Sequence, residues 1–105
     1  MSGGINADIY LKITVLAAIM RNPNSCHSDI ISTIMDAGAV FEKPNRSTVN
    51  LLLTRLYNEK LVTRTRVGGE KIGTWGYRYT ATSKGSEQVK REMARFARIL
   101  SMSMA

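Results

Sequence analysis

The chain has 105 residues, and its 44% hydrophobic and 22% charged residues are typical of a globular protein rather than a disordered one. No apolar run reaches the ~18 residues that a transmembrane helix needs, and the first residues lack the basic segment of a secretory signal. The single cysteine, Cys26, cannot form an internal disulfide, which favours a reducing cytoplasm. We therefore expect one cytoplasmic domain over residues 1–105, with residues 1–6 flexible and no membrane association.

The net charge of +7 is concentrated in the middle of the chain. Residues 1–45 carry a net charge of −1, residues 46–91 carry +7, and the last fourteen residues carry +1. Clustered positive charge is typical of proteins that bind nucleic acid. Anionic lipid is the alternative partner, but these basic residues are spread over several predicted elements rather than one amphipathic helix, which disfavours it.

The first predicted helix runs from about Ala7 to Met20. Ile9, Ile13 and Leu16 lead to Met20 at helical spacing, and further apolar side chains lie on a second side of the same helix. A helix that is apolar on two sides is buried on both of them. In so small a protein, the second partner can be another subunit.

A second helix is predicted over Cys26–Ala37, with Ser25 as its N-cap and Gly38 as the residue that ends it. Cys26 and His27 are the one cysteine and the one histidine of the chain, so they do not assemble a metal site. Adjacent residues also have poor geometry for a catalytic dyad. We expect both to be structural or surface residues, and we expect no metal and no cofactor.

The third predicted helix, Asn45–Glu59, follows Pro44 and has two different faces. Pro44 is excluded from helix interiors, and Asn45 is a good N-cap. One face is an apolar stripe at positions i, i+3, i+4 and i+7, which predicts a core contact: Val49, Leu52, Leu53 and Leu56. The opposite face carries hydroxyl, amide and guanidinium groups around one leucine: Ser47, Asn50, Leu51, Thr54, Arg55 and Asn58. Two helices on a short connector, the second with such a face, form a helix-turn-helix pattern.

A two-stranded hairpin is predicted after this helix, from the segments Leu61–Val67 and Tyr77–Ala81. In the first strand Val62 shares its side with Arg64 and Arg66, which is unfavourable unless the hairpin is a twisted ribbon that leaves the core. The glycines between the strands do not indicate a nucleotide site, because no helix follows them directly and no Gly-Lys-Ser/Thr motif is present.

The last predicted helix spans residues 82–104, with Thr82 as its N-cap. Its apolar residues form one long stripe: Val89, Met93, Phe96, Ala97, Leu100 and Met104. This stripe either packs on its own domain or pairs with the first helix of a second subunit. We expect the second arrangement, because a chain of this length has a small core.

Two stretches resemble winged helix-turn-helix transcriptional regulators. Ser47-Thr48-Val49, Leu53-Thr54-Arg55-Leu56 and Glu59-Lys60-Leu61-Val62 are similar to the S-T-V, L-x-R-L and E-G-L-I elements of these proteins. Tyr79-Thr80-Ala81-Thr82-Ser83-Lys84-Gly85 is similar to their Y-x-L-T-x-K-G signature. The combination is most similar to the PadR-like group and its MarR-like and penicillinase-repressor relatives, over roughly residues 9–100. Lys60 stands where these proteins have glycine, and Ala81 where they have leucine.

The resemblance implies an α+β, mainly helical, winged helix-turn-helix fold with three helices, a two-stranded wing and a C-terminal dimerisation helix. It implies a dimeric repressor that binds palindromic double-stranded DNA. The helix Asn45–Glu59 would enter the major groove, where four residues are placed to meet base edges: Ser47, Asn50, Leu51 and Thr54. DNA backbone contacts are expected from the same helix and the wing: Arg46, Thr48, Arg55, Arg64, Arg66, Lys71 and Arg78. The expected dimer interface combines the first and last helices: Ile9, Ile13, Val89, Met93, Phe96 and Leu100.

Two other functions remain open on the sequence. A winged helix can serve as a protein-interaction adaptor, for example in a mobile element, and Ile72 and Trp75 would favour this if exposed. A sequence-tolerant architectural or RNA-binding protein is the other alternative. An enzyme is not expected, because the chain offers no nucleophile–base pair, carboxylate pair or metal set.

Overall fold

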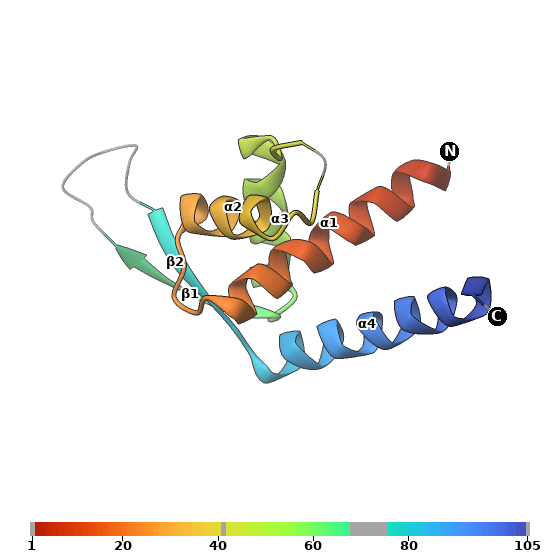
Figure 1. Ribbon diagram of the computed structural model, residues 1–105. Helices are drawn as coiled ribbons and strands as arrows, with labels where there is room; N and C mark the ends of the chain where they lie inside the picture. The colour runs from red at the N-terminus through yellow and green to blue at the C-terminus, as the bar shows by residue number, and fades with distance from the viewer. Residues whose placement is uncertain (1, 41, 68–75, 105) are drawn as a thin grey trace.

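The computed structural model describes residues 2–40, 42–67 and 76–104 (Figure 1). Its elements follow in the order α1 (Ser2–Arg21), α2 (His27–Asp36), α3 (Arg46–Asn58), β1 (Val62–Val67), β2 (Gly76–Ala81) and α4 (Ser83–Met104). The two strands pair antiparallel and form the wing, which projects from one end of the molecule, whereas both chain termini lie at the other end. This arrangement confirms the predicted mainly helical α+β, winged helix-turn-helix fold.

The core lies where α1 meets α2, α3, α4 and β2. All four stripe residues predicted for α3 are buried in it. They pack with side chains from the other elements: Val15, Leu16, Ile19, Ile30, Ile34, Leu61, Val62, Tyr79 and Val89. Several elements of the same protomer pack against α1, which explains why this helix is apolar on more than one side.

The bounds of α1 differ from the prediction at its start. The helix begins at Ser2 rather than near Ala7, so residues 2–6, predicted to be flexible, lie in its first turns. Extending an established helix costs much less than nucleating one, which allows the added turns despite two glycines. No helix among the described residues is long and apolar enough to cross a membrane.

The start of α2 also differs from the prediction, because Cys26 rather than Ser25 is its N-cap. The backbone of Ser25 is committed elsewhere: its amide donates to the Tyr79 carbonyl (3.1 Å), and the Tyr79 amide donates to the Ser25 carbonyl (2.8 Å). This bridge ties the α1–α2 connection to the wing. The Cys26 amide and thiol instead donate to the Asp29 carboxylate, which lowers the pKa of Asp29.

Both helices of the helix-turn-helix end in a left-handed residue. Gly38, with φ of 67°, ends α2 as predicted. At the end of α3 the Leu61 amide donates to the Leu56 carbonyl (2.9 Å) and the Lys60 amide to the Tyr57 carbonyl (3.0 Å), which is a Schellman motif. Lys60 occupies its left-handed position with φ of 64°, where a glycine would be unstrained.

The start of α4 packs directly against this turn. The Thr82 hydroxyl accepts from the Gly85 amide (3.0 Å), so Thr82 is the N-cap as predicted, and it donates to the Lys60 carbonyl (2.8 Å). The Thr82 amide donates to the Leu61 carbonyl (3.0 Å). A Cβ atom on Gly85 would overlap that same carbonyl oxygen, so this position requires glycine. We call these contacts the α3–α4 junction.

The single histidine joins the N-terminal ends of α2 and α3. The Nε2 atom of His27 donates to the Arg46 carbonyl at 3.3 Å. Partial burial lowers the pKa of His27, the carbonyl hydrogen bond works against this shift, and the nearby Arg46 charge adds to it. The hydrogen bond from His27 therefore helps to fix the angle between the two helices.

We predict that Lys60→Gly raises the free energy of unfolding by about 0.5–1 kcal/mol, because relief of the left-handed strain exceeds the entropy cost of a glycine. Urea denaturation followed by circular dichroism measures this change. Lys60→Ala is the matched control, since it removes the same charge but keeps the Cβ atom. Equal stability of the glycine and alanine variants would contradict the prediction.

We predict that His27 makes the protein less stable as the pH falls through its ordinary pKa of about 6.5. Above that pH the histidine is neutral in both the folded and the unfolded state, so it does not change the free energy of unfolding. Below it the unfolded chain binds the proton first, because the pKa of the folded state is lowered. Urea denaturation between pH 7.5 and 5.5 should show a smaller loss for His27→Gln, which keeps a donor but does not titrate. Parallel pH profiles for the two proteins would rule the effect out.

Candidate nucleic-acid interface

The outer face of α3 presents an unobstructed set of polar side chains. Its four predicted base-contacting residues are all exposed, and Leu51 among them has 53% of its surface accessible. The three predicted backbone-contacting residues of the same helix, Arg46, Thr48 and Arg55, are exposed as well. The Asn45 side chain accepts from the Ser47 amide at 2.8 Å, which fixes the start of the helix. The Thr54 hydroxyl donates to the Asn50 carbonyl (3.1 Å), which leaves its oxygen as an acceptor.

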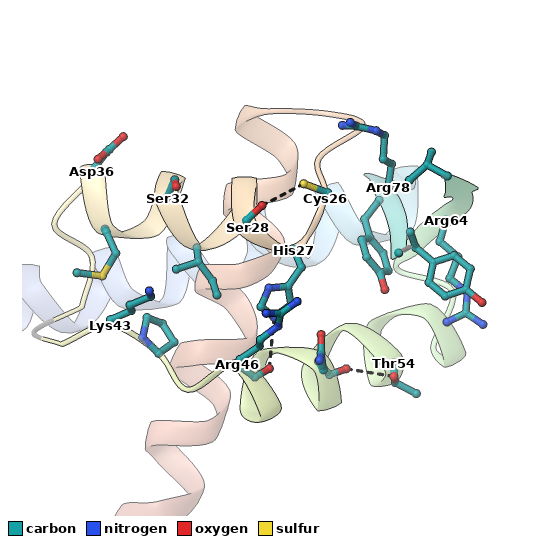
Figure 2. A pocket seen from close by; sticks show the side chains of 18 residues that line it. Cys26, His27, Ser28, Ser32, Asp36, Lys43, Arg46, Thr54, Arg64 and Arg78 are labelled. Atoms are coloured by element: carbon teal, nitrogen blue, oxygen red, sulfur yellow. Dashed lines mark hydrogen bonds between the residues drawn. The ribbon is translucent and has the colours of Figure 1, made fainter. Parts of the chain in front are cut away.

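A groove of about 1050 Å³ lies beside this face. Figure 2 shows α2 on one side of it, and α3 with the segment that precedes it on the other, while the wing closes one end. Four cationic side chains line it, Lys43, Arg46, Arg64 and Arg78, against the one carboxylate of Asp36. The groove is therefore suited to an anionic partner.

Lys43 is a member of this site that the sequence did not single out. It lies in the connector before α3, and the net negative charge of residues 1–45 hides it in a count along the chain. The sequence feature that could have identified Lys43 is its position directly before Pro44 and Asn45, the N-cap of α3.

The arginines of the wing differ in their surroundings. Arg66 is exposed. The Arg78 guanidinium donates to the Asn24 carbonyl (3.1 Å) and lies 3.7 Å from the Asp29 carboxylate, so it points towards the α1–α2 connection and away from α3 (Figure 2). The guanidinium of Arg64 lies against tyrosine rings. The predicted backbone contact at Lys71, and the residues Ile72 and Trp75, fall outside the described residues.

Val62, Arg64 and Arg66 lie on the same side of β1, and the path of this strand explains how one side holds both an apolar and two basic residues. Val62 pairs with Ala81 at the base of the wing and is buried, Arg64 pairs with Tyr79 and is half-buried, and Arg66 is exposed. The strand leaves the core along its length, as the sequence requires of a ribbon with this pattern.

The residues predicted for a dimer interface fall into two groups. Ile13 and Val89 have only 2% and 6% of their surfaces exposed in the single chain, so they offer almost nothing to a partner and belong to the protomer's own core. Ile9, Met93 and Leu100 are well exposed, and Phe96 is half-buried with its ring centroid 6.5 Å from that of Tyr10. An apolar groove of about 370 Å³ lies between α1, α2 and α4, beside Met93 and Phe96.

Among the described residues, no group of three histidine, cysteine, aspartate or glutamate side chains is placed to hold a metal ion. The arrangement of the site is instead that of a surface: an exposed helix face, a cationic groove and a projecting hairpin. Such a surface can bind a polyanion.

Solved structures with the same fold include two of nearly the same length. A PadR-like transcription factor from Bacteroides fragilis superposes with a TM-score of 0.77 and 22% identity, covering 96% of this chain and 93% of that one. A transcriptional regulator from Clostridium thermocellum gives a TM-score of 0.74 and 15% identity, covering 97% and 92%.

A third match is Bacillus subtilis PadR in complex with operator DNA, with a TM-score of 0.65 and 23% identity. It covers 79% of this chain but 47% of that protein, so the present chain spans about half of its length. No protein-family model matches the sequence, and no curated protein matches it either. At these identities the likeness concerns the backbone: the chain has the winged helix-turn-helix fold seen in PadR-like transcription regulators.

Proposed function

We propose that this protein is a PadR-like, sequence-specific DNA-binding regulator that acts as a dimeric repressor on a palindromic site. The observation that carries the proposal is the exposed, carboxylate-free outer face of α3 beside a groove lined by four cations and one carboxylate. The operator complex of Bacillus subtilis PadR, which shares the fold, supports duplex DNA as the partner.

In the proposed complex α3 lies in the major groove. Asn50 is able to make two hydrogen bonds to one adenine. The Ser47 hydroxyl can accept from or donate to a base edge, and the Thr54 hydroxyl, whose proton goes to the Asn50 carbonyl, can accept. Leu51 stands between them as an apolar contact, suited to the methyl group of thymine. These contacts give the protein its sequence preference.

Contacts to the DNA backbone set the register. Arg46, Thr48 and Arg55 flank the base-contacting residues on α3, and Arg66 adds positive charge on β1. Lys71, in the sequence between the two strands, is the further backbone contact that we propose. Each neutralised phosphate releases counterions, so the affinity falls steeply with salt concentration.

A dimer places two such helices on one site. The exposed apolar residues of α1 and α4, Ile9, Met93 and Leu100, together with Phe96 beside the 370 Å³ groove, form the proposed interface. Burying them adds to the modest core of a 105-residue chain. A two-fold axis there would separate the α3 helices by about one turn of DNA, ~34 Å.

One observation favours the alternative of a protein-interaction adaptor. Leu51 has 53% of its surface exposed in the middle of the outer face of α3, and apolar residues of this kind also occur at the centre of protein interfaces. The binding experiment below separates the two functions.

We predict tight binding of this protein to a duplex from the region upstream of its own coding sequence. Arg55→Ala should weaken binding about ten-fold and Lys71→Ala by a similar factor, because each loses a charge-assisted phosphate contact. Fluorescence anisotropy at several salt concentrations measures both affinity and salt dependence. Arg98→Ala removes the same charge from an exposed position of α4 and should bind as the unchanged protein does.

A random duplex of the same length and composition is the specificity control. Equal affinity for the two duplexes at physiological salt would exclude a sequence-specific regulator and leave the architectural alternative. Absence of binding to both duplexes would favour the adaptor, with Leu51 at its contact surface.

We predict that Met93→Glu converts the dimer to a monomer, because a carboxylate at the proposed interface would lose its water without gaining a partner. Sedimentation velocity measures the mass. Ala94→Glu introduces the same charge on the neighbouring exposed position of α4 and should stay dimeric. A dimeric Met93→Glu protein would remove this part of α4 from the interface.

A further inference from the structure

The Arg64 side chain of β1 makes an unusual set of contacts for a residue in a DNA-binding wing. The central carbon of its guanidinium lies 3.9 Å from the centroid of the Tyr57 ring and 4.2 Å from that of Tyr77. Tyr57 belongs to the last turns of α3, whereas Tyr77 belongs to β2. One guanidinium therefore connects the helix that carries the proposed base contacts to both strands of the wing. Figure 2 shows the Arg64 side chain reaching from the wing towards α3.

The cluster around Arg64 is extended by a third tyrosine. The Tyr77 and Tyr79 rings meet edge to face, with centroids 6.2 Å apart. Tyr79 is buried, and its backbone is held by the bridge to Ser25. Burial raises the pKa of Tyr79, while the neighbouring Arg64 charge opposes that shift. The cluster thus rests on a fixed point of the core.

The contacts of Arg64 depend on the shape of a guanidinium. This group is planar and weakly hydrated, so it stacks on aromatic faces at small desolvation cost, whereas the compact ammonium of lysine is strongly hydrated. Its position against two rings also restricts its approach to a phosphate. Arg66, two residues further along β1, is exposed.

We propose that Arg64 is a positioning residue that sets the angle of the wing relative to α3 through Tyr57 and Tyr77, rather than a phosphate contact. The proposal rests on the DNA-binding function proposed above. It assigns to Arg64 a role different from the backbone contact that its basic character suggests. The base of the wing is fixed by the α3–α4 junction and its β2 side by the Ser25–Tyr79 bridge, so Arg64 supplies the connection between β1 and the end of α3.

The two roles predict different responses to substitution, measured as affinity for the cognate duplex across salt concentrations. If Arg64 positions the wing, then Arg64→Ala, Arg64→Lys and Tyr57→Leu each weaken binding about five-fold, the size expected when a cation–π contact is lost. Tyr57→Leu changes no charge, so it leaves the salt dependence as it was. Tyr57→Phe keeps the ring and should restore most of the affinity lost in Tyr57→Leu.

A phosphate contact would give the opposite pattern. Arg64→Lys would then retain most of the affinity, Tyr57→Leu would bind as the unchanged protein does, and Arg64→Ala would lower the slope of log K against log salt by about 0.9. That pattern would overturn the proposal.

A measurement without DNA separates this proposal from the function on which it rests. In the nuclear magnetic resonance spectrum of the free protein, ring currents of the two tyrosines should move the Arg64 side-chain resonances upfield, and Tyr57→Leu should reduce that shift. Arg64 resonances at ordinary positions would overturn the proposal even if DNA binds tightly. An upfield shift that responds to Tyr57→Leu would support the contact even if no DNA is bound.

Discussion

The position of the proposed DNA-binding surface depends on the α3–α4 junction. At this junction two turns of the chain meet: one joins the end of α3 to the start of β1, and the other joins the end of β2 to the start of α4. The carbonyls of Lys60 and Leu61, in the first turn, each accept a hydrogen bond from Thr82, in the second. Gly85 allows the α4 backbone to approach the Leu61 carbonyl where a side chain would collide with it. Because one set of backbone groups holds all four elements, a displacement of α4 would be transmitted to the base of the wing and the end of α3. The two sequence stretches that resemble winged helix regulators are the two sides of this contact.

The buried stripe of α3 determines which side chains of this helix are exposed. Val49, Leu52, Leu53 and Leu56 fix the rotation of α3 about its axis, because all four are buried against α1 and its neighbours. The hydroxyl and amide side chains on the other side of α3 are then exposed together. His27 adds a second constraint at the opposite end of the helix, through the Arg46 carbonyl. The outer face is thus held at both ends of α3 as well as along its length.

Most of the fold follows from local sequence patterns, and the exceptions have physical causes. The helices, the hairpin, the Asn45 and Thr82 caps and the end of α2 at Gly38 follow from periodicity, capping chemistry and turn residues, which act over a few positions. The displaced start of α2 arises because Ser25 pairs with Tyr79, a partner 54 positions away that no local pattern reveals. Similarly, Ile13 and Val89 lie on the expected apolar stripes, but only the tertiary arrangement shows that one protomer already buries them. On the candidate site, the exposed face of α3 was predictable, whereas the contacts of Arg64 and Arg78 depend on which distant groups surround them.

The positive charge of the chain is therefore only partly available to a polyanion. Arg78 is engaged by Asn24 and Asp29, and Lys12 of α1 pairs at 2.7 Å with Glu59 at the end of α3. An exposed ion pair of this kind contributes little to stability, but it reduces the field that a distant phosphate experiences. The net charge of +7 is therefore not a count of phosphate contacts, because the attraction depends on where the cations lie on the surface. What distinguishes this surface is the arrangement of the remaining cations, which border an exposed helix face whose proposed base-contacting groups are uncharged. In the proposed complex, long-range attraction and sequence preference would come from different side chains, so a substitution could change one and leave the other.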